Sequence, residues 1–164
     1  MEKNVDRIEG VPISEILVVA AEVTAAATTI LLTKGSDRKG GYLVIRKRDS
    51  GEILLHEKVG TIAPPESDQR YLTFAKEKGE RLGPNGLSSW QSRNLQQEKY
   101  GGAIATSSGL IVSFSGLPEL WDEALVLVIS NRLGWISGKE VFDIIEISGN
   151  TFVELLLGTV LLNQ

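Results

Sequence analysis

The sequence predicts an α+β fold in which two antiparallel hairpins form one sheet flanked by helices. Short β-type runs occur in pairs joined by glycine-containing turns, and helical patterns lie before, between and after the pairs. No strand–helix–strand unit with a short phosphate loop is present, which argues against a doubly wound parallel sheet. The 164 residues suit one domain. We expect an N-terminal tail at 1–11, an α+β domain at 12–134, and a C-terminal extension at 135–164, helical and packed on the domain or on a partner.

The first helix is predicted from apolar residues that recur every three or four positions between 13 and 31. Pro12 suits the first turn, Ser14 is a possible cap, and Lys34-Gly35 resembles a helix end. The same stretch raises the question of a membrane span. It contains Glu22 and is short for a span, so we predict a buried helix and no membrane partner.

The first hairpin and the second helix follow. The runs 42–45 and 52–59 flank Asp49-Ser50-Gly51, which has turn chemistry. The basic run 46–48 is expected to be solvated near that turn. Residues 66–78 have helix-forming composition, and Gly79 and Gly83-Pro84 are predicted to end the helix.

The second hairpin and the third helix form the best-defined part of the sequence. The strands 101–106 and 110–114 flank a Ser-Ser-Gly turn. Ser115 is expected to cap the next helix, with Pro118 near its first position. The first turns of this helix contain Glu119, Asp122 and Glu123. Acidic side chains are favoured there by the positive end of the helix dipole.

Three further segments complete the chain. Residues 84–100 are polar and predict a loop with one short strand at most. Residues 141–147 are compatible with a strand or a helix, and their spacing is closer to a helix. An apolar helix is expected at 151–162.

Composition excludes several kinds of chemistry. The chain has no cysteine and one histidine, which removes disulfides, thiolate catalysis and multi-histidine metal sites. Its formal charge is −4, from 17 basic and 21 acidic residues, which disfavours nonspecific nucleic-acid binding. We therefore predict no metal, no catalytic residue and no nucleic-acid partner. The N-terminus lacks the pattern of a signal peptide, which favours a cytoplasmic location.

Two positions offer chemistry but have simpler structural interpretations. His56 is a possible general base or haem ligand, although an ordinary strand residue explains it better. Ser115-Gly116 lies between a strand and a helix without the glycine pattern of a nucleophile elbow. A nucleophilic serine would need a base, and an anion site at the helix start would face acidic neighbours.

Residues 101–129 resemble the GlcG/HbpS-like family of haem-binding or haem-degrading domains, and the wider likeness covers about 12–133. The matching features are Gly102-Ala103-Ile104, Ser115-Gly116, Pro118-Glu119, Asp122-Glu123-Ala124, Asp49-Ser50-Gly51 and Ala75-Lys76. The resemblance implies a profilin-like or PAS-like domain that forms a homo-oligomer. We take His56, Lys76, Gly102, Ser115 and Gly116 as candidate ligand-binding residues. Haem is the ligand that the family suggests, but its members carry a histidine near the first helix and this chain does not, so no cofactor is predicted.

Three functions are compatible with these features. The first is a non-enzymatic small-molecule-binding or sensory module of that kind. The second is a scaffold that acts through homo-oligomerisation, with the apolar tail at the interface. The third is an enzyme that uses carboxylates or a serine, which the missing cysteines and the single histidine disfavour.

Overall fold

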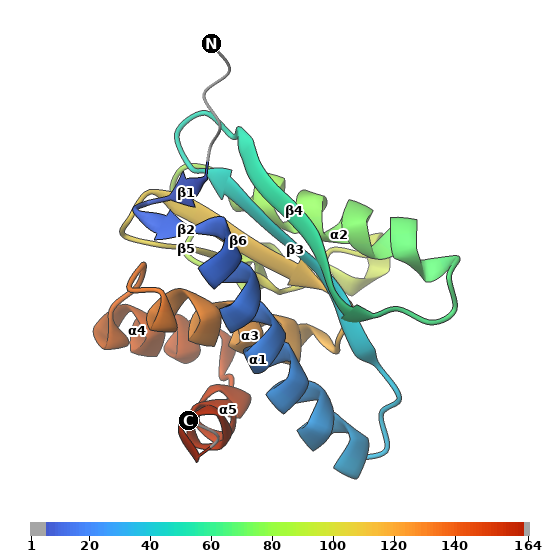
Figure 1. Cartoon of the computed structure of the whole chain (residues 1–164). Helices are drawn as coiled ribbons and strands as arrows, with labels where there is room; N and C mark the ends of the chain where they lie inside the picture. The colour runs from blue at the N-terminus through green and yellow to red at the C-terminus, as the bar shows by residue number, and fades with distance from the viewer. Residues whose placement is uncertain (1–5, 163–164) are drawn as a thin grey trace.

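A four-stranded antiparallel sheet lies at the centre of the computed structural model, which describes residues 6–162 (Figure 1). Its strands are β3 (Lys39–Lys47), β4 (Ile53–Thr61), β5 (Ala103–Ala105) and β6 (Leu110–Ser115). Their order across the sheet is β4-β3-β6-β5, so each predicted hairpin forms and the two hairpins join through β3 and β6. The predicted α+β class is confirmed.

Helices cover both faces of this sheet. α2 (Ser67–Leu82) packs on one face, and α1 (Ile13–Thr33) and α3 (Glu119–Arg132) pack on the other. α4 (Gly138–Ser148) and α5 (Phe152–Leu162) lie against α3 on the side away from the sheet (Figure 1).

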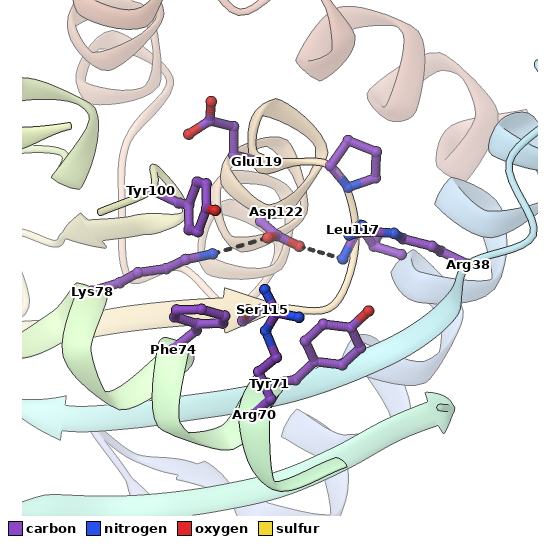
Figure 2. A pocket seen from close by; sticks show the side chains of 11 residues that line it. Arg38, Arg70, Tyr71, Phe74, Lys78, Tyr100, Ser115, Leu117, Glu119 and Asp122 are labelled. Carbon is purple, nitrogen blue, oxygen red and sulfur yellow. Dashed lines mark hydrogen bonds and ion pairs between the residues drawn. The ribbon is translucent and has the colours of Figure 1, made fainter. Parts of the chain in front are cut away.

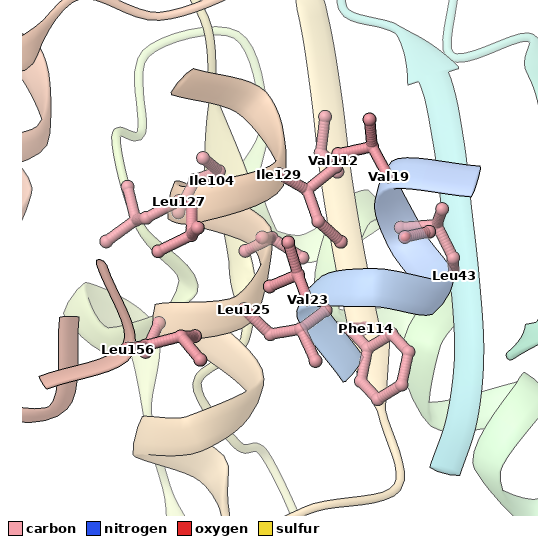
Figure 3. Packing of buried hydrophobic residues seen from close by; sticks show 14 of the residues in the cluster. Val19, Val23, Leu43, Ile104, Val112, Phe114, Leu125, Leu127, Ile129 and Leu156 are labelled. Carbon is pink, nitrogen blue, oxygen red and sulfur yellow. The ribbon is translucent and has the colours of Figure 1, made fainter. Parts of the chain in front are cut away.

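The alternation of side chains along β6 separates the two faces. Ser113 points to α2 and donates a hydrogen bond to the carbonyl oxygen of Ala75 at 2.7 Å. Its neighbours Val112 and Phe114 point the other way into the main core, where α1 and α3 supply Val23 and Leu125 (Figure 3). This face holds most of the buried apolar side chains.

The N-terminal segment differs from the expected tail. β1 (Arg7–Ile8) and β2 (Val11–Pro12) form a small hairpin, and Ile8 is only 2% exposed because it packs into the main core. The rest of the predicted tail, residues 1–5, lies outside the described residues.

α1 begins and ends close to the predicted positions. Pro12 precedes it and Ser14 makes no cap, so that expectation was wrong. Lys34 and Gly35, with a φ of +85°, end the helix as expected. α1 is the one described helix long and apolar enough to cross a membrane, and 44% of its most apolar window is buried in the domain.

α2 continues past Gly79 and ends at Leu82, with Gly83 as its C-cap, so the expected end was wrong at Gly79 and confirmed at Gly83. Arg46 is only 4% exposed and crosses α2, where it donates to the carbonyl oxygen of Lys76 at 2.8 Å. A Cβ at Gly79 would lie 2.9 Å from Nε of Arg46, so this glycine makes room for the guanidinium within the helix. The expectation that 46–48 is solvated was therefore wrong for Arg46.

The connecting loop and the C-terminal segment follow the predicted pattern. Two 3₁₀ turns, Ser89–Ser92 and Leu95–Gln97, occupy the loop before β5. The ambiguous segment 141–147 is helical and belongs to α4, which begins with a capping box of Ser137 and Glu140. α5 contributes to the main core, and Phe152 stacks on Trp121 with ring centroids 4.6 Å apart.

Candidate binding site

A cavity of about 260 Å³ lies between α2 and the start of α3, and we call it the α2–α3 pocket (Figure 2). Its floor, its walls and its mouth come from segments far apart in the sequence. Polar side chains form the floor, aromatic rings form the walls and guanidinium groups lie at the mouth. The floor has Lys78, Ser115 and Asp122, the walls have Tyr71, Phe74 and Tyr100, and the mouth has Arg38 and Arg70.

Helical spacing places three of these side chains together. Tyr71, Phe74 and Lys78 lie three and four residues apart on one face of α2. This face is turned to the start of α3, so two aromatic rings reach the pocket and the lysine reaches its floor.

A buried ion pair forms the floor. Nζ of Lys78 lies 2.9 Å from Oδ2 of Asp122 and donates to the carbonyl oxygen of Phe114, also at 2.9 Å. The other carboxylate oxygen of Asp122 accepts the amide N–H of Leu117 at 2.9 Å. Burial raises the pKa of Asp122 to about 6, and the charge of Lys78 opposes that rise. The pair connects helices that lie on opposite faces of the sheet.

The ion pair between Lys78 and Asp122 lies at the edge of the sheet, directly beside Gly102. A Cβ on Gly102 would lie 2.8 Å from Nζ of Lys78 and 2.9 Å from Cβ of Asp122. Its φ is +125°, which side-chain-bearing residues rarely adopt. Gly102 therefore leaves the space through which Lys78 reaches α3.

Ser115 presents an unused hydroxyl to the pocket. The residue is 5% exposed, and its hydroxyl makes no hydrogen bond to the part of the chain that the structure describes (Figure 2). It was expected to cap α3, and this was wrong. Ser115 is the last residue of β6, the cap position belongs to Pro118, and Asp122 binds the amide of Leu117 instead.

Aromatic rings and guanidinium groups surround the opening. The rings of Phe74 and Tyr100 meet edge to face, with centroids 5.5 Å apart and planes at 88°. Arg70 lies over the Phe74 ring at 5.3 Å, and Arg38 lies over the Tyr71 ring at 6.0 Å. Both arginines are exposed at the mouth and the rings are half-buried.

Hydrogen bonds fix the loop that supplies Tyr100. Arg81 of α2 donates to the carbonyl oxygens of Ser89, at 2.9 Å, and of Tyr100. Glu119 accepts the amide N–H of Gly101 at 2.9 Å and pairs with Arg93. The carboxylate of Glu119 is thus engaged with the loop.

Glu123 forms a second buried carboxylate site. It is 0% exposed and accepts hydrogen bonds from Ser88 at 2.7 Å, from Asn150 at 3.2 Å and from Ser148. Burial raises the pKa of Glu123, and the two serine hydroxyls oppose the rise. The acidic start of α3 was expected to serve the helix dipole alone, and Asp122 and Glu123 instead organise buried contacts.

The structure brings together only part of the predicted ligand site. Ser115 lines the α2–α3 pocket, Gly102 adjoins its floor, and Gly116 lines an adjoining cavity of about 330 Å³. His56 is exposed on β4 opposite Val44, outside the pocket. Lys76 is half-buried on α2 and its side chain does not line the pocket.

Sequence reasoning missed the arginines, Tyr100 and the ion pair. A signal was available for the lysine, because Lys78 stands in the same helical stripe as Tyr71 and Phe74. A lysine in a half-apolar stripe indicates a buried cation that needs a partner. Nothing in the spacing identified Asp122 as that partner.

An apolar groove lies between α3, α4 and α5, away from the pocket. It measures about 420 Å³, and Phe142 on its rim is 69% exposed. The homo-oligomer expected from the sequence stays a prediction, and so does the scaffold function that depends on it.

Within residues 6–162 no group of three or more metal-ligating side chains is gathered. Comparison with family models, with curated proteins and with solved structures finds no significant match to this chain. The resemblance to the GlcG/HbpS-like family, and haem as a ligand, therefore stay predictions.

Proposed function

We propose that this chain is a non-enzymatic module that binds a small molecule in the α2–α3 pocket. The observation that carries the proposal is the hydroxyl of Ser115, which makes no hydrogen bond to the described residues and opens into a cavity with aromatic walls. Ligand pockets carry a few polar groups that fix the orientation of the ligand, and an unpaired hydroxyl at the pocket wall is a position for a ligand atom.

The arrangement of the floor supports binding rather than catalysis. Asp122 is held by Lys78 and by the amide of Leu117, and Glu119 is held by the loop. Within residues 6–162, no histidine or carboxylate that could act as a base is hydrogen-bonded to Ser115. These groups form a fixed surface, in keeping with a preorganised binding site.

A fragment screen against the isotope-labelled full chain tests the proposal. We expect some fragments to shift the amide resonances of Gly101, Gly102 and Ser115, which lie at the pocket. The variant Ser115→Leu fills the cavity and should remove these shifts, whereas Ser108→Ala in the β5–β6 turn should leave them unchanged. A screen of neutral, cationic and anionic fragments without a saturable shift at the pocket would contradict the proposal.

A further inference from the structure

The charge around the α2–α3 pocket points to an anionic ligand, an inference that rests on the proposed function. Both acids at the pocket are engaged, Asp122 with Lys78 and Glu119 with Arg93. Arg38 has no ion pair within residues 6–162, and Arg70 meets only the exposed Glu98, at 3.8 Å. A chain of net charge −4 thus presents at this opening one guanidinium group, that of Arg38, without an ion pair to the described residues, beside the loosely paired Arg70.

Arg38 is the guanidinium placed to meet a ligand. It lines both the α2–α3 pocket and the adjoining cavity, and in Figure 2 its side chain extends toward the pocket from the start of β3. Its positive charge also favours the ionised form of Asp122 and lowers the pKa of that carboxyl. The side chain is exposed, so it can turn to a bound anion without breaking an ion pair.

The two acidic side chains beside the α2–α3 pocket limit the negative charge that the ligand carries. Glu119 and Asp122 lie beside the cavity and would repel a dianionic phosphate more strongly than a carboxylate. They also occupy the start of α3, where free amides would otherwise favour phosphate. A singly charged carboxylate fits this balance better.

The walls define the rest of the ligand. Phe74 and Tyr100 meet at a right angle and, with Tyr71, give the cavity flat apolar surfaces. An apolar cavity of about 150 Å³ holds one benzene ring. The α2–α3 pocket, at about 260 Å³, therefore has room for one substituted ring and little more.

We propose that the ligand is a small aromatic monocarboxylate. Its ring packs against Tyr71 and the contacting pair of Phe74 and Tyr100. Its carboxylate accepts hydrogen bonds from the Ser115 hydroxyl and the Arg38 guanidinium. The Ser115 hydroxyl donates to the carboxylate within the pocket, and the charge of Arg38 selects for a negative ligand at the opening.

Three probes that share one ring test this inference. Benzoate, benzamide and phenyl phosphate are titrated into the isotope-labelled full chain, and affinity is read from the resonances of the pocket. We expect benzoate to bind more tightly than both others. Arg38→Gln should weaken benzoate about tenfold and Ser115→Ala about fivefold, since hydrogen bonds to charged groups are the stronger ones. Lys139→Gln removes an equal charge from a side chain that is 86% exposed on α4 and should change nothing.

Each other outcome overturns the inference. Equal binding of benzamide, or an unchanged affinity in Arg38→Gln, would refute the anionic class while leaving a small-molecule site in place. Tighter binding of phenyl phosphate would refute the carboxylate. If none of the probes shifts the pocket, the aromatic carboxylate is wrong, and the fragment screen then decides separately whether the pocket binds any small molecule.

Discussion

Replacing Lys78 by methionine removes the cation of the buried ion pair and leaves Asp122 in place. Both side chains are 2% exposed, so solvent screens the pair little. In Lys78→Met the carboxylate keeps one hydrogen bond, from the amide of Leu117. Breaking a buried pair by removing one partner costs about 3–5 kcal/mol. We expect the free energy of unfolding at pH 8 to fall by that amount.

The loss should depend on pH because Asp122 can become neutral. Burial raises its folded pKa to about 6, above the ordinary 3.8, so the folded state binds more protons than the unfolded state between these values. The contribution of Asp122 to stability therefore falls as the pH rises through this window. Without Lys78 the folded pKa rises further, and the fall continues to higher pH in the variant. The difference in stability between the two proteins should thus grow between about pH 6 and pH 8.

Urea denaturation of the full chain at several pH values measures this difference. Lys76→Met is the matched control, since Lys76 lies on the same helix with a half-buried side chain and should change stability by about 0.5 kcal/mol or less. Adding Asp122→Asn to Lys78→Met should recover about 2 kcal/mol, because a neutral amide keeps an acceptor for Leu117. A loss below about 1 kcal/mol at pH 8, or one independent of pH, would refute the reasoning.

Two other substitutions test the buried contacts. Glu123→Gln places an amide among the donors Ser88 and Asn150 and should lower the free energy of unfolding by about 2 kcal/mol, with the exposed Glu154→Gln as control. Gly102→Ala should cost at least about 2 kcal/mol, because of its positive φ and its contact with Lys78. The control Gly138→Ala adds its Cβ to open space and should leave the melting temperature nearly unchanged. An unchanged melting temperature would contradict the buried hydrogen bonds of Glu123 in the first variant, or the close approach of Gly102 to Lys78 in the second.

The arrangement of secondary structure was largely predictable because its signals are local. Short apolar runs joined by glycine-containing turns predicted both hairpins of the sheet. The three- and four-residue spacing of apolar residues between 13 and 31 predicted α1. Of the two glycines expected to end α2, Gly83 does so, whereas Gly79 lies within the helix and makes room for Arg46, a residue of β3. A glycine that ends a helix and one that admits a neighbouring side chain look the same in sequence.

The candidate site was predictable only in part. Ser115 and Gly102 were selected through the family resemblance, and the structure places Ser115 at the α2–α3 pocket and Gly102 beside its floor. Asp122 was assigned to the helix dipole, yet it pairs with a lysine 44 residues earlier in the chain. His56 was singled out as the only imidazole and lies exposed on β4.

The sequence alone determined the order of the elements, the class of fold and the exclusion of thiol and multi-histidine chemistry, because these depend on composition and on spacing along the chain. Only the tertiary structure decided which polar groups are buried together and which hydroxyl is left free. A buried charge such as Lys78 is stable only beside its partner, and that partner is defined by the packing of α2 and α3 across the edge of the sheet. The pocket, and the proposals that depend on it, therefore follow from contacts between segments that are distant in the sequence.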